Sequence, residues 1–519
     1  MSDLNMKYYL AIDVGTTNWK AAIFNCEGVL CGIRRTPALT HVDEAGNSYY
    51  NPQELWESLQ RLCREVSGDT RCRISGVSVT SIAEAVVPID REGNTIGNII
   101  TWYDTRSMEQ ARWLSDLYTP ERIYEITGLD VNPIFSLPKI LWVREHEPEK
   151  FERACKWLQM ADFVIYCLTG EVITDYTLAS RTLAFHVEEN RWSDEILNGV
   201  GLCSDIFPDI CESGTVIGSI GAEISKLTGI TKGAKVVVGG NDHPCASIAA
   251  GAIHGDKILD SSGTAESYIY ISRKGAVPRM KFEGQRTCRY LQRDRFALWG
   301  GIICSGRSFD WAYETLTSSR CFDIRQENYS LPQILNQLEN EKGMESGIIF
   351  YPHLRGAGAP YWNPRISGSF MGLRDTHTAK NMMRAVLEGL SMQARMIIEM
   401  EQKLAGVDVT SVCVVGGSSN NFQWQTIKAN VTKKCIELCH EPEATALGAA
   451  MLAAIGDGVY KNIEEVSDAI SSHNEIIYPD DAMVKRYEPL YELYKDGYKQ
   501  IEHFNEQIYY AMRGDICHR

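Results

Sequence analysis

The chain repeats one pattern in its two halves: a strand, an acidic residue, a turn of small residues and a returning strand. "YYLAIDVGTTNWKAAIF" spans residues 8–24, and "KILDSSGTAESYIYIS" spans residues 257–272. Each stretch predicts a β-hairpin, because β-rich runs flank a turn of Gly, Thr and Ser. The same order and spacing indicate a structural duplication. We therefore expect two related domains, residues 1–253 and residues 254–519, with a cleft between them.

The remaining pattern predicts an α/β fold. Strands at 8–13, 19–24 and 29–35 form an antiparallel meander, and a helix at 53–66 and a strand at 74–80 follow. A chain of 519 residues is also too long for one hydrophobic core, which agrees with two domains. Further helices are expected at 381–403, 443–455 and 484–512, and the pattern leaves open on which domain the last one packs.

Composition favours a small-molecule partner. A net charge of -15 opposes binding to nucleic acid or to an anionic membrane surface. The 16 cysteines are scattered without a CxxC pair, so reduced and mostly buried thiols are expected. The start of the sequence has no basic segment followed by an apolar one, and no apolar run is long enough to cross a bilayer, so we expect a cytoplasmic protein.

The two hairpin turns are candidate phosphate sites. The first turn carries Thr16 and Thr17, and the second carries Ser262, Gly263 and Thr264. Small hydroxylated residues let backbone N–H groups and hydroxyls converge on an anion. Two such turns facing each other would clamp a polyphosphate, whereas either turn alone is better explained as an ordinary hairpin.

Asp13 and Lys20 are the charged residues of the first hairpin. Asp13 ends an aliphatic strand, and a carboxylate beside phosphates is suited to hold Mg²⁺ or its waters. Lys20 adds a positive charge to the phosphate site or is a solvated strand residue, and the sequence favours neither interpretation.

Asp242 is the candidate general base. It lies in "GGNDHP", between a buried strand at 235–238 and an alanine-rich helix at about 244–252. An acid fixed at a cleft can accept the proton of an attacking hydroxyl, although an acid at this place most often caps a helix. His243 is the other candidate base, and its alternative is a structural hydrogen bond.

A third glycine cluster lies in "VCVVGGSSNNFQWQ", residues 412–425. Such a turn lets a base or ribose lie against the backbone. The usual P-loop and GxGxxG nucleotide loops are absent, and no GxSxG or HExxH motif indicates a hydrolase.

Taken together, these stretches resemble the FGGY family of carbohydrate kinases over nearly the whole chain. Three further motifs agree: "TWYDTR" at 101–106, "DYTLASRTLAF" at 175–185 and "GSFMGLRDTHTAKNMMRAVLEG" at 368–389. "GGNDHPCASIAAGA" is similar to the family's Gly-Gly-x-Asp motif, and "IFSLPKILWVREH" fits its amino-terminal signature except at Ile134.

The resemblance implies two ribonuclease-H/actin-like (ASKHA) domains and transfer of the γ-phosphoryl group of Mg²⁺·ATP to a sugar or polyol hydroxyl. Asp242 would be the base and Asp13 the metal-associated acid. The implied phosphate contacts are Thr16, Thr17, Lys20, Ser262, Gly263 and Thr264, and the implied adenosine contacts are Gly417, Ser418 and Asn420. The sugar contacts would be Glu84, Trp102, Asn241, Asp242 and His243.

The segment "VTSIAEAVVPID", residues 79–90, bears on the substrate. Glycerol kinases show Asn-Gln-Arg-Glu there, whereas this chain keeps Glu84 after Ser81, Ile82 and Ala83 and so lacks the arginine. Ile134 likewise replaces an aromatic hydroxyl. Losing both donors disfavours glycerol and favours a ketopentose or ketohexose, such as a xylulose- or fuculose-like sugar, unless residues elsewhere restore the donors.

Several alternatives stay open. One is a kinase of a smaller polyol such as glycerol or erythritol, and another is a non-enzymatic sugar sensor on the same fold. A chaperone-like or filament-forming ATPase would share the phosphate clamp but would not need the sugar motifs. No nucleic-acid or membrane partner is expected, and a homodimer is left open.

Overall fold

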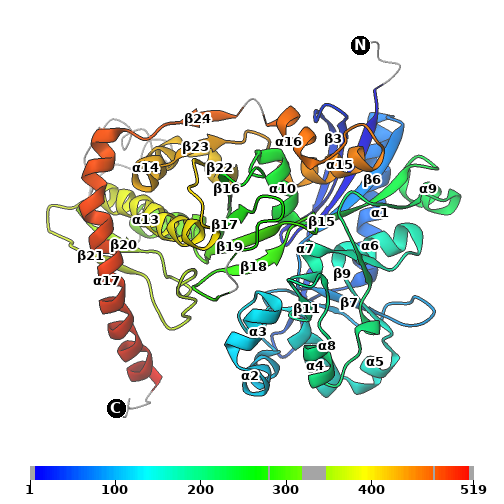
Figure 1. Ribbon diagram of the computed structural model, residues 1–519, viewed down its shortest axis with the longest axis horizontal. Coiled ribbons are helices and arrows are strands. Elements are labelled where there is room, and N and C mark those ends of the chain that lie inside the picture. Colours follow the sequence, from blue (N-terminus) through cyan, green and yellow to red (C-terminus); the bar gives the residue numbers. More distant parts are fainter. Residues whose placement is uncertain (1–5, 279–280, 318–346, 472–473, 514–519) are drawn as a thin grey trace.

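Two β-sheets lie side by side in the computed structural model, which describes residues 6–278, 281–317, 347–471 and 474–513 (Figure 1). The first sheet has six strands in the order β14-β15-β6-β1-β2-β3. Their bounds are Val216–Ser219, Lys235–Asn241, Ile74–Ser81, Tyr8–Val14, Asn18–Asn25 and Leu30–Pro37. The meander predicted from the sequence is confirmed, because β1, β2 and β3 pair antiparallel.

The second sheet has seven strands in the order β18-β19-β17-β16-β22-β23-β24. Their bounds are Arg286–Arg289, Phe296–Ile302, Glu266–Ile271, Lys257–Ser262, Ser411–Gly416, Cys435–Leu438 and Glu475–Ile477. In each sheet an antiparallel run is extended by two parallel strands. The run has three strands in the first sheet, extended by β6 and β15, and four in the second, extended by β22 and β23. The α/β class and the structural duplication are therefore confirmed.

The long helices lie where the apolar spacing predicts them. α1 spans Pro52–Thr70, and the Asn51 side chain accepts hydrogen bonds from the first free N–H groups of that helix. α10, α13, α15 and α17 span Asp242–Ala250, Ala379–Ala405, Ala444–Gly456 and Asp481–Arg513. α17, at the left of Figure 1, packs on α13 and α14 (Phe422–Thr432) of the second half through a row of buried tyrosines.

Smaller elements complete both halves. A lobe of the first half, below its main sheet in Figure 1, carries several short helices. The remaining helices are α2 Met108–Leu117, α3 Pro120–Thr127, α4 Ser136–His146, α5 Pro148–Arg153, α6 Met160–Thr169, α7 Tyr176–Ala179, α8 Asp194–Gly199, α9 Ala222–Thr228, α11 Gly306–Thr317 and α16 Ile463–Ile470, with 3-10 turns η2 Ser204–Ile206 and η3 Gly417–Asn420. The remaining strands are β4 Thr40–Val42, β5 Ser48–Tyr50, β7 Val86–Ile89, β8 Ile99–Ile100, β9 Lys156–Gln159, β10 Ile173–Asp175, β11 Phe185–His186, β12 Arg191–Trp192, β13 Asp209–Cys211, β20 Ile349–Tyr351 and β21 Ser369–Met371.

Helices α10 and α15 join the two halves. α10 leaves β15 of the first sheet and contacts β16 and β22 of the second, whereas α15 follows β23 of the second sheet and packs on β1, β6 and β15 of the first. The two helices cross so closely that a Cβ atom at Gly448 would lie 1.9 Å from the carbonyl oxygen of Cys245. Only glycine fits at this contact.

The described residues bear on two expectations drawn from composition. No helix among them is long and apolar enough to cross a membrane. Their cysteines are all free; six are buried, six are half-buried, and Cys31 and Cys203 are exposed, so the expectation of mostly buried thiols is met only in part. Cys321 and Cys517 lie outside the described residues.

The helix crossing makes a test of the fold. Gly448→Ala should lower the free energy of unfolding by about 1–3 kcal/mol, because the methyl group overlaps a backbone oxygen that cannot move by itself. Gly68→Ala is the matched control, since Gly68 lies in α1 with open space around its Cβ position, and it should raise stability by about 0.5–1 kcal/mol. Denaturant unfolding measures both; equal stability of the two variants would show that the crossing does not limit the fold.

Candidate active site

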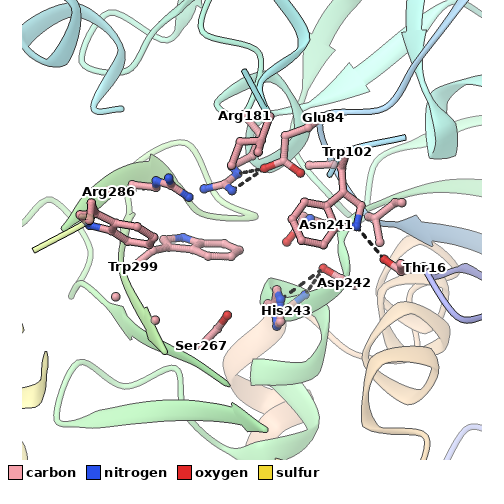
Figure 2. Close-up of a pocket in the computed structure, with 16 residues that line it drawn as sticks. Thr16, Glu84, Trp102, Arg181, Asn241, Asp242, His243, Ser267, Arg286 and Trp299 are labelled. Atoms are coloured by element: carbon pink, nitrogen blue, oxygen red, sulfur yellow. Dashed lines mark hydrogen bonds and ion pairs between the residues drawn. The ribbon is translucent and has the colours of Figure 1, made fainter. Parts of the chain in front are cut away.

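One cavity of about 200 Å³ lies where the two halves meet, and both contribute to its wall (Figure 2). The first half provides Thr16, Ile82, Ala83, Glu84, Trp102, Ile134, Arg181, Asn241, Asp242 and His243. The second half provides Ser267, Arg286, Trp299, Gly300, Gly301 and Trp362. All five residues expected to contact sugar thus line one cavity, together with Thr16 of the first hairpin.

Strand register explains why the first-half residues converge. Val14 of β1 pairs with Ser81 of β6, and Ser81 pairs with Asn241 of β15. These three strands therefore end at the same edge of the sheet, and the segments that follow them carry Thr16, Glu84 and Asp242. This is the usual place for a ligand in an open parallel sheet.

A buried ion pair joins Glu84 to Arg181. Arg181 Nε donates to Glu84 Oε1 at 2.7 Å, and its Nη2 contacts the same oxygen. The guanidinium also lies 4.9 Å from the ring centroid of Trp299. Burial acts to lower the pKa of Arg181, but the charge and hydrogen bond of Glu84, together with Cys288, outweigh it and raise that pKa. The pair can orient a substrate hydroxyl at the cavity wall.

Arg181 bears on an alternative that the sequence left open, in which residues elsewhere restore the donor missing at Ala83. Arg181 brings a guanidinium to Glu84 from nearly a hundred residues away, so this alternative holds for the arginine. It lies in the "DYTLASRTLAF" stretch, yet only the tertiary fold shows that it reaches the cavity. Ile134 does line the wall as an apolar residue, as its position in the signature suggests.

A second ion pair crosses between the halves. Arg286 of β18 binds Asp130 of the first half, with Nε 2.5 Å from Oδ1, and its guanidinium lies 4.2 Å from the ring centroid of Trp362. Burial acts to raise the pKa of Asp130, but Arg286 outweighs it and holds that pKa below its usual value. Both arginines of the wall are thus paired with carboxylates. Sequence reasoning missed Arg286, Trp299 and Trp362, because their own segments carry no signal of a site.

Asp242 is the first residue of α10 and faces the cavity (Figure 2). Asn241 holds the N-cap position, so the alternative in which Asp242 is the N-cap is wrong. Asp242 Oδ1 accepts a hydrogen bond from the backbone N–H of His243 at 2.9 Å, and the side chain stays 24% exposed. His243 Nε2 lies 4.0 Å from the same oxygen, and its ring meets Trp299 edge-on.

Asp13 and Lys20 form a charge cluster with Glu443. Lys20 Nζ lies 2.6 Å from Glu443 Oε2 and 3.5 Å from Asp13 Oδ2. Lys20 is therefore not a solvated strand residue, and that alternative is wrong. Burial raises the pKa of Asp13 to about 7; Lys20 opposes this rise, while Asp242 and Glu443 add to it. Sequence reasoning missed Glu443, which comes from the start of α15.

The chemistry of Asp13 fits a magnesium ion. Mg²⁺ keeps several waters and binds proteins through one or two carboxylates together with substrate phosphates. Asp13 offers one carboxylate, and Asp242 lies close enough that its charge helps to raise the pKa of Asp13. The described ranges contain no group of three or more His, Cys, Asp or Glu side chains that could hold a metal alone. A site completed by phosphates is consistent with both findings.

The two hairpin turns are open to an anion. Gly15 N–H bonds to Asn18 O in the first turn, Gly263 N–H bonds to Ala265 O in the second, and the tips at Thr17, Gly263 and Thr264 are exposed. The predicted adenosine turn, Gly417, Ser418 and Asn420, forms the 3-10 turn after β22. Gly416 pairs with Ser262, so this turn lies beside the second hairpin. Of all these turn residues, only Thr16 lines the cavity.

The raised pKa of Asp13 gives a pH-dependent stability. Asp13 loses its proton at lower pH in the unfolded state than in the folded state. Its stabilising contribution to the fold is therefore complete below the pKa that Asp13 has in the unfolded state, and it is lost as pH rises through about 7. The unmodified chain should lose on the order of 2–3 kcal/mol of its free energy of unfolding between pH 5 and pH 8, and Asp13→Asn should not show this loss. Unfolding of both proteins without Mg²⁺ or nucleotide measures this, with Asp408→Asn on the surface as the control. Parallel pH curves for Asp13→Asn and the unmodified chain would contradict it.

Characterised proteins resemble this chain along its whole length. A xylulose kinase of Bacillus subtilis is 30% identical over 97% of this chain and 99% of the relative. A gluconokinase of the same species is 25% identical over 99% of each, and a glycerol kinase of Saccharolobus islandicus is 28% identical over 96% of this chain and 98% of the relative. These three relatives differ in substrate, so similarity alone does not select one.

A solved structure and two family models agree. The crystal structure of a ligand-bound xylulose kinase from Lactobacillus acidophilus superposes with a TM-score of 0.87 at 22% identity, covering 96% of this chain and 98% of that chain. It supports the expected ribonuclease-H/actin-like fold of two domains, which is confirmed. The N-terminal and C-terminal domain models of the FGGY family of carbohydrate kinases match residues 8–249 and 261–456. The chain therefore belongs to the FGGY family of carbohydrate kinases, enzymes that phosphorylate sugar hydroxyls with ATP as the donor.

Proposed function

We propose that this kinase phosphorylates a neutral ketopentose or ketohexose, with a xylulose-like sugar as the first candidate. The observation that carries the proposal is the cavity: its volume suits a five- or six-carbon polyol, and its two arginines are each neutralised by a carboxylate. The xylulose kinase relative supports the same choice.

Cavity size separates short polyols from longer ones. The cavity has a volume of about 200 Å³. A cavity of about 150 Å³ is large enough to hold benzene, a molecule of six carbon atoms, so a five- or six-carbon sugar is of the right order of size for this space. A triol would leave part of the cavity to water and would contact fewer of the indole rings of Trp102, Trp299 and Trp362.

Charge separates a neutral sugar from a sugar acid. Arg181 is paired with Glu84, and Arg286 is paired with Asp130, so neither guanidinium is free to balance a substrate carboxylate. Asp242 would repel such a carboxylate. An aldonate would therefore bring an uncompensated negative charge into a buried site, which is costly. This argument disfavours gluconate although a gluconokinase is among the relatives.

A smaller polyol such as glycerol or erythritol is the second candidate. The observation in its favour is the position of Arg181, which restores a guanidinium donor beside Glu84. The apolar side chain of Ile134 and the size of the cavity count against it.

In the proposed reaction Asp242 accepts the proton of the attacking hydroxyl. His243 and Asn241 hold the sugar beside it, and Glu84 with Arg181 orients hydroxyls at the far wall. Thr16, Thr17 and Lys20 would contact the phosphates from one side, and Ser262, Gly263 and Thr264 from the other. Gly417, Ser418 and Asn420 would hold the adenosine. Mg²⁺ at Asp13 would supply positive charge to the phosphates when bound.

Asp242→Asn tests the assigned base. The change is nearly isosteric, so the protein should fold and bind ATP, while sugar-dependent ADP formation should fall about 100-fold to 10,000-fold. Coupled ADP release and calorimetric ATP titration measure the two properties. Asp408→Asn, an exposed acid that pairs with Lys434 on the surface, is the control and should keep full activity. An Asp242→Asn variant with near-normal turnover would remove Asp242 from the chemistry.

A substrate panel tests the sugar class. ADP release should be measured with D-xylulose, L-xylulose, L-fuculose, D-ribulose, D-fructose, erythritol, glycerol and gluconate, and the phosphorylated product identified by NMR. We expect at least one ketose to exceed glycerol and gluconate in kcat/KM at least about tenfold. Each polar group of the cavity that a substrate leaves without a hydrogen-bond partner costs binding energy. If glycerol were the best substrate, the smaller-polyol alternative would replace this assignment, and if gluconate were, the charge argument would fail.

A further inference from the structure

A buried lysine lies beneath the cavity and takes no part in the proposed chemistry. Lys139 of α4 is 1% exposed, and its Nζ donates to three backbone carbonyl oxygens: Glu84 at 3.1 Å, Trp102 at 3.2 Å and Ile134 at 2.7 Å. All three acceptor residues line the cavity. One ammonium group therefore touches the backbone of three separate parts of the wall.

These three parts belong to separate segments of the first half. Glu84 follows β6, Trp102 follows β8 and Ile134 precedes α4, and each lies in a turn or irregular segment. Figure 2 shows the side chains of Glu84 and Trp102 on the same side of the cavity. An ammonium group has three N–H donors, and here each finds one carbonyl acceptor. Lys139 thus acts as a three-way link between segments that carry site residues.

The link to Glu84 bears on a strained residue. Glu84 has a φ of 69°, a left-handed conformation that is costly for a residue with a side chain. This conformation accompanies the contact of its carboxylate with Arg181. A hydrogen bond from Lys139 to the Glu84 carbonyl helps to hold it.

The link to Trp102 reaches toward the first hairpin. Trp102 Nε1 donates to Thr16 Oγ1 at 3.0 Å, so the position of Trp102 is coupled to a residue of the phosphate turn. The Trp102 carbonyl bonded to Lys139 therefore fixes a ring that meets both the cavity and that turn.

We propose that Lys139 is a positioning residue for the sugar: by holding the backbone of Glu84, Trp102 and Ile134 in register, it sets sugar affinity without touching the substrate. The inference rests on the proposed function only in taking this cavity as the sugar site. It predicts that losing the ammonium weakens sugar binding while ATP binding is kept.

The charge state of Lys139 adds a second consequence. Burial lowers its pKa to about 7; Glu84 and Asp104 oppose this shift, and Arg106 adds to it. These facing charges are themselves paired, Glu84 with Arg181 and Asp104 with Arg106. A neutral amine has two N–H donors for three carbonyls, so sugar affinity should fall as pH rises through neutrality.

Lys139→Met is the direct test, and Lys156→Met is its matched control. Lys156 also donates to a backbone carbonyl, that of Phe207 at 3.0 Å, but Phe207 does not line the cavity. The probe is the panel member with the highest kcat/KM for the unmodified enzyme. Calorimetry without nucleotide gives its Kd, and steady-state kinetics give KM for sugar and for ATP.

We expect Lys139→Met to raise the sugar Kd and KM at least tenfold with the KM for ATP within twofold, and Lys156→Met to change neither. Lys139→Arg, which keeps a buried cation with N–H donors, should bind sugar more tightly than Lys139→Met. A folded Lys139→Met protein with unchanged sugar Kd would overturn the inference, while activity of the unmodified enzyme on a ketose would leave the proposed function standing.

The pH dependence keeps the inference testable if Lys139→Met does not fold. The sugar Kd of the unmodified enzyme, measured without Mg²⁺ and nucleotide, should rise severalfold between pH 6 and pH 8.5. Lys139→Arg should lose most of this rise, because a guanidinium keeps its protons in that range. A Kd that does not change with pH in the unmodified enzyme, or an equal rise in both proteins, would contradict the inference.

Discussion

The contact between α10 and α15 is the constraint on which the two-sheet arrangement depends. Gly448 lets the backbone of α15 approach Cys245 of α10 closely, and no side chain could fit between them. Each helix follows a strand of one sheet and packs on the other sheet. The halves are therefore joined by exchanged helices and not by a flexible linker, and the strand ends that carry the site are held at a defined separation.

Several residues at the site are held in unfavourable states, and the rest of the fold must be stable enough to hold them there. Burial raises the pKa of Asp13 to about 7 even though Lys20 lies beside it, so an ionised Asp13 is costly until a positive charge meets it. Glu84 is held in a left-handed conformation, and Lys139 is buried with its pKa lowered to about 7. Unfavourable features of this kind gather at functional sites, because a scaffold can hold them only where neighbouring contacts are strong.

The cavity depends on the second half as much as on the first. Trp299, Trp362 and Arg286 close it, and the ion pair between Arg286 and Asp130 connects the two halves at its edge. Because both arginines are matched by carboxylates, the wall offers hydrogen bonds without a net attraction for anions. This balance of charge depends on each arginine lying beside its carboxylate, so it cannot be recognised from either residue alone.

The sequence by itself determined the α/β class, the duplicated hairpins and the long helices, because strand alternation, turn residues and helical spacing act over short distances along the chain. It also pointed to Asp13, Glu84, Trp102 and Asp242, since each lies in or beside a local motif. Only the tertiary structure decided that Arg181 reaches Glu84, that Glu443 reaches Lys20 and that Lys139 joins three cavity segments. These contacts join residues from 5 to more than 400 positions apart, and most of them leave no local pattern because packing alone brings such side chains together.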